Sequence, residues 1–188
     1  MRKLIFAINT TLDGCVDHTK QSVDDEIHTF FADLTKEADI QIFGRKTYEL
    51  MVPYWPEAAN DPTSTPTELE FAEAFNSTEK VVFSRTLETV DDENTRIAQD
   101  DLHDEVQSLK QEDGRNILVG GVEIASQLVE LGLIDEYLFV VSPAIAGEGR
   151  RLFDNISLTE RPQLKLVDSK FFASGTVALR YKVTGKEL

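Results

Sequence analysis

Hydrophobic positions along the chain switch between short apolar runs and repeats of about 3.6 residues, the patterns of strands and helices respectively. Apolar runs predict strands at residues 3–9, 40–43, 81–83, 116–119 and 136–141. Helical spacing predicts a first helix that begins after a Ser22 cap. It predicts four further helices, at residues 45–51, 67–75, 101–110 and 122–131. Strands that alternate with helices are typical of a mostly parallel central sheet, so an α/β fold is expected.

The last part of the chain carries two longer strand-like runs, at residues 163–172 and 176–184, separated by Ala173-Ser174-Gly175. A Gly-containing break between two such runs predicts a hairpin, which would add antiparallel strands at one edge of the sheet. Residues 53–56, Pro-Tyr-Trp-Pro, are interpreted as an aromatic loop. No repeat or linker interrupts the pattern, so residues 1–188 are interpreted as a single domain.

The chain is acidic, with 34 Asp and Glu residues against 19 Lys and Arg and a net charge of −15. Domains that bind nucleic acid or anionic membranes are usually basic, so neither partner is expected. Either solubility or a salt-rich cytoplasm explains the acidity. The single cysteine, Cys15, excludes an internal disulfide, and no metal site is expected. No segment approaches ~18 uninterrupted apolar residues, so a cytoplasmic protein is expected.

Three predicted strands end in a similar way, because each is followed by a small residue. After this small residue comes either the start of a helix or a basic side chain. These ends contain Gly44, Arg45, Lys46 and Thr47; Ser84 and Arg85; and Gly120 and Gly121. In open α/β sheets ligands bind beyond the carboxyl ends of strands, and helix N-termini there attract anions. Glycine at one such junction is commonly only a turn, but three such ends favour a phosphorylated ligand. Neither GxGxxG nor a Walker lysine motif is present.

The segments FAINTTLDG, FGRKTYE, KVVFSRTL and ILVGGVEIASQLVELGLIDEYLFVVSPAIAGEGRRLF occur in this order, followed by the final strand pair. Together they span nearly the whole chain and resemble the dihydrofolate reductase-like fold. The resemblance is strongest to the reductase domain that ends the bifunctional riboflavin-synthesis deaminase-reductases. It implies a three-layer fold with helices on both faces of a mixed, mostly parallel sheet. No His-x-Glu with a later Pro-Cys-x-x-Cys is present, so the zinc deaminase half is missing and a stand-alone reductase domain is expected.

The resemblance also implies a cofactor and the segments that bind it. In that fold, residues 44–47 and 84–85 hold the adenosine side of NADPH, including the 2′-phosphate. The double glycine and the residues after it hold the pyrophosphate; these residues are Val122, Glu123 and Ile124. The first strand, near Ala7 and Ile8, contacts the nicotinamide. NADPH is therefore expected in preference to NADH, the Gly120–Gly121 peptide is expected to be cis, and a homodimer is expected.

The resemblance also points to candidate proton donors. Folate reductases place a carboxylate on the first long helix, and counting back from GRKT puts His28 at that position, with Asp24 one turn earlier. An Asp–His pair would supply a proton near neutral pH, but His28 also suits a half-exposed helix position. Asp13, in TTLDG, is either a third catalytic candidate or a turn aspartate. Tyr54 and Trp55 either wall a flat substrate or form a small core cluster.

These patterns favour an enzyme that transfers hydride from NADPH to a C=N or C=O bond of a pteridine- or ribosylaminopyrimidine-like heterocycle. The small-molecule heterocycle is then its partner. A second interpretation is a catalytically impaired nucleotide-binding module that acts as a sensor or assembly subunit, which His28 in the acid position would explain. A third, a flavin-binding oxidoreductase, is also compatible with the pattern.

Overall fold

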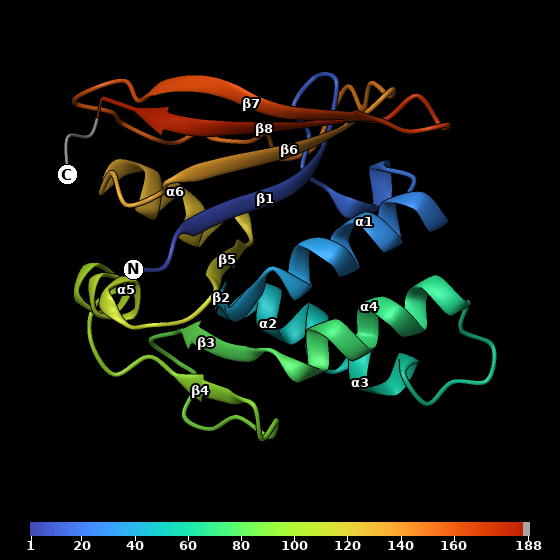
Figure 1. Ribbon diagram of the computed structural model, residues 1–188, viewed down its shortest axis with the longest axis horizontal. Coiled ribbons are helices and arrows are strands. Elements are labelled where there is room, and N and C mark those ends of the chain that lie inside the picture. The colour runs from blue at the N-terminus through green and yellow to red at the C-terminus, as the bar shows by residue number, and fades with distance from the viewer. Residues whose placement is uncertain (186–188) are drawn as a thin grey trace.

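The computed structural model describes residues 1–185 and contains, over that range, one eight-stranded sheet in the order β4-β3-β2-β5-β1-β6-β8-β7 (Figure 1). The strands are β1 (Leu4–Thr11), β2 (Ala38–Gly44), β3 (Glu79–Phe83), β4 (Thr95–Ile97), β5 (Asn116–Gly120), β6 (Glu136–Ser142), β7 (Gln163–Phe171) and β8 (Val177–Thr184). The helices are the 3-10 helix η1 (His18–Lys20) and α1 (Asp25–Lys36), α2 (Arg45–Met51), α3 (Tyr54–Ala58), α4 (Pro66–Ser77), α5 (Leu102–Gln111) and α6 (Val122–Glu130). The strands β1 to β6 pair with one another in parallel. The last two strands are antiparallel, because β8 pairs antiparallel with β6 and β7 pairs antiparallel with β8. The mixed, mostly parallel sheet and the terminal hairpin are therefore confirmed.

Helices cover both faces of the sheet because successive residues of a strand point to opposite sides. On β1, Leu4 and Phe6 pack in the cluster that includes α5 and α6, whereas Ile5 packs with Ile27 of α1. On the same side as Ile5, Phe43 of β2 packs in a cluster with buried residues of the helices α2, α3 and α4. Figure 1 shows α1 and α4 on one side of the sheet and α5 and α6 on the other, which confirms the three layers.

The first helix begins later in the chain than predicted, since the sequence indicated Ser22 as its N-cap. α1 starts at Asp25, and its N-cap is Asp24, whose side chain accepts a hydrogen bond from the Ile27 N–H at 3.0 Å. Serine and aspartate are both good caps, so the local pattern did not separate them. The burial of the residues that follow each cap differs, because Val23, which would open a helix capped by Ser22, is 40% exposed, whereas Ile27 in the first turn of α1 is buried.

Two short elements differ from the prediction or were missed by it. Residues 53–56, predicted as a loop, fall largely within α3, whose Trp55 and Ala58 are buried. Pro56 is tolerated there because it lies in the first turn, where its missing N–H needs no partner. β4 is only three residues long, too short for an alternating pattern to be recognised. Among the helices of residues 1–185, none is long and apolar enough to cross a membrane.

The double glycine after β5 adopts a different backbone from the one expected. The Gly120–Gly121 peptide is trans, as are the other peptide bonds of residues 1–185, so the prediction of a cis bond is wrong. Close packing explains the first glycine instead, because a β-carbon on Gly120 would lie 2.5 Å from the Phe43 ring. Gly121 has a φ of 90°, which residues with a side chain rarely adopt.

The strand β7 forms one edge of the sheet and is exposed along all nine of its residues. Its register on β8 shifts around Val167, which is an extra residue in the ladder. Lys165 lies opposite Lys182 and Asp168 opposite Arg180, and these two partners are two residues apart on β8. Lys165 and Asp168 therefore share one face of the sheet, although they are three residues apart along β7.

Candidate functional site

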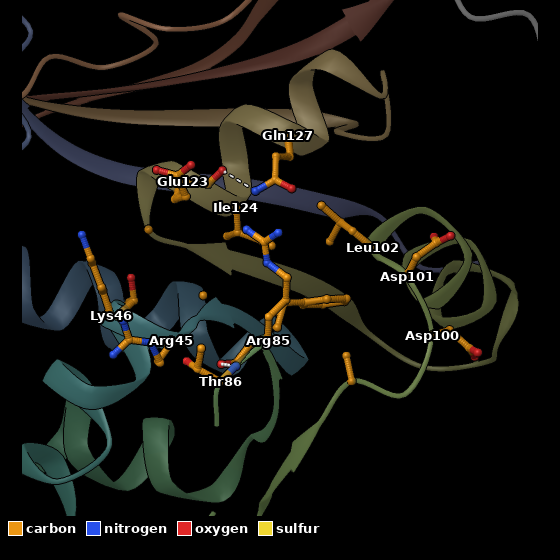
Figure 2. A pocket seen from close by; sticks show the side chains of 16 residues that line it. Arg45, Lys46, Arg85, Thr86, Asp100, Asp101, Leu102, Glu123, Ile124 and Gln127 are labelled. Carbon is orange, nitrogen blue, oxygen red and sulfur yellow. Dashed lines mark hydrogen bonds between the residues drawn. The ribbon is translucent and has the colours of Figure 1, made fainter. Parts of the chain in front are cut away.

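The three predicted strand ends converge on one cavity of about 730 Å³ (Figure 2). It lies beyond the carboxyl ends of β2 and β3 and beside the first turns of α2, α5 and α6. Nine of the predicted residues line it: Gly44, Arg45, Lys46, Thr47, Ser84, Arg85, Gly121, Glu123 and Ile124. Ligand pockets commonly measure about 300–1,000 Å³, so the cavity has room for a sizeable small molecule.

Seven further residues line the cavity and were not predicted from the sequence. They are Phe83, Thr86, Ala98, Asp100, Asp101, Leu102 and Gln127. Four of these residues follow β4, the strand that was missed, so the end of that strand was not recognised as part of a site. A signal was nevertheless present, because Asp100 and Asp101 come shortly after the apolar pair Ile97-Ala98.

Four predicted cofactor residues lie outside this cavity. Ala7 and Ile8 are half-buried in β1, which β5 separates from β2 in the sheet. Gly120 packs at the end of β5, and Val122 is the first residue of α6. A ligand that reached from the cavity to β1 would have to pass the N-terminus of α6.

The charged side chains of the cavity are separated in space. Figure 2 shows Arg45 and Lys46 at one end, Arg85 in the middle, and Asp100 and Asp101 near the other end. Because opposite charges attract and like charges repel, an anionic group is favoured near the α2 end and disfavoured beside the two aspartates.

The basic residues differ in whether they already have a partner. Arg45 donates through Nη1 to both carboxylate oxygens of Glu49, at 2.8 and 3.0 Å, along the exposed side of α2. In the described chain Lys46 and Arg85 have no such hydrogen bond or ion pair. Ser84 Oγ accepts hydrogen bonds from the N–H groups two and three residues later, at 3.1 and 2.9 Å. Arg85 and Lys46 are therefore the cations best placed to take an anionic ligand.

The start of α6 adds a second feature that attracts anions. Its N-cap is Gly121, which has no side chain to cap the helix, and Gly121, Glu123 and Ile124 line the cavity. The first N–H groups of a helix lack partners within the helix and carry partial positive charge. A phosphate group would satisfy them.

The carboxylate of Asp13 holds two loops together. It accepts hydrogen bonds from Thr11 Oγ1 at 2.6 Å and from the N–H groups of Ala146 and Gly147 at 3.1 and 3.0 Å, and it pairs with Arg151 at 3.2 Å. The bond from Thr11, followed by those from the two N–H groups, lowers the pKa of Asp13 well below its ordinary value. An ionised carboxylate of this kind has no proton to donate at neutral pH.

The predicted pairing of Asp24 with His28 does not involve their side chains. The Asp24 carboxylate caps α1, and the His28 backbone N–H donates to the Asp24 carbonyl at 2.9 Å. Within residues 1–185 no hydrogen bond joins the two side chains. The spacing of one helical turn predicted that the two residues lie on the same side of α1. The Asp24 side chain instead turns to the helix backbone, because it is the N-cap.

His28 instead lies against the aromatic cluster of α3. Its ring meets the Trp55 ring edge-on, with centroids 6.3 Å apart, and Trp55 packs on Phe71 at 4.4 Å. Trp55 is buried and its indole N–H has no hydrogen-bond partner in the described chain, while Tyr54 is 54% exposed. Trp55 therefore belongs to the core cluster between α1, α3 and α4, and Tyr54 lies at its surface.

A three-layer α/β fold with a cavity beyond its strand ends defines a class of ligand-binding α/β proteins. Residues 2–178 match the family described as the RibD C-terminal domain, and the chain belongs to that family. The family consists of reductase-like domains with the dihydrofolate reductase-like fold, which confirms the resemblance found in the sequence.

Relatives and solved structures agree with this assignment. The chain is 34% identical to YyaP of Bacillus subtilis (strain 168), an uncharacterized protein, over 98% of this chain and 96% of YyaP. A structure from Shewanella sp. PV-4, attributed to riboflavin biosynthesis, has a TM-score of 0.73 at 19% identity and covers 98% of this chain and 100% of its own. The deaminase/reductase of Thermotoga maritima has a TM-score of 0.67 at 16% identity and covers 97% of this chain but only 56% of its own. These two structures are evidence for the fold alone.

Proposed function

We propose that the protein is an NADPH-dependent reductase that transfers hydride to a C=N or C=O bond of a pteridine- or ribosylaminopyrimidine-like heterocycle. The observation that carries this proposal is the cavity in which Lys46 and Arg85 line the same space as the α6 N-terminus. Membership of the RibD C-terminal domain family supports a pyrimidine reductase-like activity. The substrate class proposed here is taken from the name of the Thermotoga maritima neighbour, a deaminase/5-amino-6-(5-phosphoribosylamino)uracil reductase that shares the fold.

The residues of the cavity fit a phosphorylated dinucleotide. Arg85, with Lys46 beside it, would hold the 2′-phosphate, and the α6 N-terminus would hold the diphosphate. Ala7 and Ile8 would then lie beside the nicotinamide. When bound, the nicotinamide would supply the hydride, whereas the protein would orient the substrate and provide a proton.

We assign the proton to His28. The carboxylate of Asp13 is committed to joining two loops and that of Asp24 to capping α1, so neither is available as an acid. His28 is half-buried, and its ring lies beside Trp55. An imidazolium at this position would protonate the nitrogen or oxygen that receives the hydride.

The second candidate function is a nucleotide-binding module that has lost its chemistry. The observation that favours it is His28, which stands where the resemblance to folate reductases places a carboxylate. Such a protein would bind NADPH through the same cavity without consuming it.

Two measurements separate these functions. Calorimetric titration should show NADPH binding more tightly than NADH, because only NADPH carries the 2′-phosphate. The absorbance of NADPH should then be followed with a panel of pterins and ribosylaminopyrimidines. Oxidation with one of them supports the reductase, and tight binding with no oxidation by any of them supports the module. No binding of either nucleotide contradicts both, and a yellow purified protein would point to a flavin instead.

We propose further that the active form is a cytoplasmic homodimer joined through β7. An exposed edge strand presents unpaired N–H and C=O groups, which a second copy of β7 satisfies when it pairs antiparallel. If Lys165 of each copy faces Asp168 of the other, two opposite-charge pairs form on one face. In the same register Leu166 meets Val167, both of which are 48% exposed in the single chain.

A further inference from the structure

The segment after β6 is fixed in place by the first loop. Backbone hydrogen bonds run from the Val16 N–H to the Arg150 carbonyl at 3.0 Å and from the Leu152 N–H to the Gly14 carbonyl at 2.9 Å. The Asp13 carboxylate holds the same segment at the Gly147 N–H. These contacts determine where the Arg150 side chain starts, so its position results from the fold.

Arg150 reaches the first turn of α6 from this segment. Its Nη2 lies 3.1 Å from Oε2 of Glu123, a residue that lines the cavity two positions after Gly121. A glutamate beside a phosphate would repel it, and Arg150 neutralises that charge. The two side chains are 42% and 75% exposed, so the pair is open to solvent and contributes little to stability.

We propose that Arg150 is a further phosphate-binding residue, which leaves Glu123 and binds the diphosphate of the nucleotide that the cavity holds. The proposal rests on the proposed function. An exposed arginine–glutamate pair is weak, whereas a guanidinium and a phosphate form two parallel, charge-assisted hydrogen bonds. The exchange is therefore favourable once a diphosphate occupies the α6 N-terminus. Arg150 would thus recognise a part of the ligand that Arg85 does not.

The test uses ADP as the probe for the diphosphate and adenosine 2′-monophosphate as the probe for the 2′-phosphate. Calorimetry on the full chain compares the wild type with Arg150→Gln, Glu123→Gln and the double variant. Arg150→Gln should weaken ADP binding by about tenfold, the scale of one charge-assisted hydrogen bond, and leave binding of adenosine 2′-monophosphate unchanged. Arg161→Gln, an exposed arginine on the same connecting segment, is the matched control and should change neither.

The double variant decides whether Arg150 touches the ligand. If it does, Arg150→Gln should weaken ADP binding about as much in the Glu123→Gln background as in the wild type. If Arg150 only neutralises Glu123, the double variant will bind ADP as well as Glu123→Gln does, and the inference is overturned while the proposed function stands. If neither probe binds the folded wild-type protein, the proposed function fails and this inference fails with it. Thermal unfolding of each variant confirms that it is folded.

Discussion

Gly121 lies so close to Thr47 that a β-carbon on Gly121 would stand 2.2 Å from the Thr47 hydroxyl oxygen. This contact joins the start of α6 to the first turn of α2, and both line the cavity. A glycine at position 121 is therefore needed to bring the two helix starts together, whatever ligand the cavity binds.

Gly121→Ala should destabilise the protein by about 2–4 kcal/mol, because it adds an overlap with Thr47 to a φ of 90° that alanine rarely adopts. Gly132→Ala is the control, since Gly132 also has a positive φ but its β-carbon would meet no atom within 4 Å. It should cost only about 1–2 kcal/mol. Denaturant unfolding measures both. Equal losses would show that the contact with Thr47 relaxes without cost.

Arg85→Ala should weaken NADPH binding by about 1.5–3 kcal/mol, the value of a charge-assisted hydrogen bond, and change NADH binding much less. Arg45→Ala should act in the same direction but more weakly, because the Arg45 guanidinium must first leave Glu49. Calorimetric titration with both nucleotides measures the effect. An equal loss for NADPH and NADH would mean that Arg85 does not recognise the 2′-phosphate.

Asp13→Asn should reduce stability, and the reduction should depend on pH. The native pKa of Asp13 is lowered, first of all by its hydrogen bond from Thr11, so the unfolded chain takes up this proton before the native one as the pH falls. The contribution of Asp13 is thus present above the ordinary pKa of 3.8 and is lost as the pH falls below that value toward the lowered native pKa.

Thermal unfolding at pH 7 and at about pH 3 tests this sign. The difference in Tm between the wild type and Asp13→Asn should be larger at pH 7 and should shrink at the acid end. Asp154→Asn, at an exposed aspartate of the connecting segment, should show no such trend. A difference that grows toward low pH would contradict the role given to the Asp13 carboxylate.

His28→Gln should lower turnover by about a hundredfold or more with a confirmed substrate and leave NADPH affinity nearly unchanged. The dependence of turnover on pH should also differ between the wild type and His28→Gln, because a glutamine side chain cannot donate the proton. His103→Gln, at an exposed histidine of α5, should keep wild-type turnover. Unchanged turnover and an unchanged pH profile in His28→Gln would remove His28 as the acid and leave water as the proton source.

Asp168→Lys should convert the proposed dimer to a monomer, because it would place two lysines opposite each other in the β7 pairing. The double exchange Lys165→Asp with Asp168→Lys reverses both charges and should restore the dimer. Analytical ultracentrifugation measures the masses. A wild-type dimer that survives Asp168→Lys would place the interface on another surface, and a monomeric wild type would contradict the dimer itself.

Local features of the sequence were enough to predict most of the fold. The helix over residues 45–51 agrees with α2 residue for residue, because Gly44 ends a strand there and the apolar spacing changes at once. The hairpin was equally visible, since two long strand-like runs flank a Gly-containing turn. Three cavity walls followed from the same reasoning, because the carboxyl ends of parallel strands must meet at one edge.

Partners distant in sequence were decided only by the tertiary structure. Asp13 looked like either a turn residue or a catalyst, and its hydrogen bonds to residues more than 130 positions away could not be derived from TTLDG. The position of Asp100 and Asp101 in the cavity could not be predicted, because they follow β4, a strand too short to show an alternating pattern. Hydrophobic periodicity and turn residues act over a few neighbouring positions, so they can be recognised in the sequence. The contact of one loop with another depends on how the whole sheet brings the two loops together.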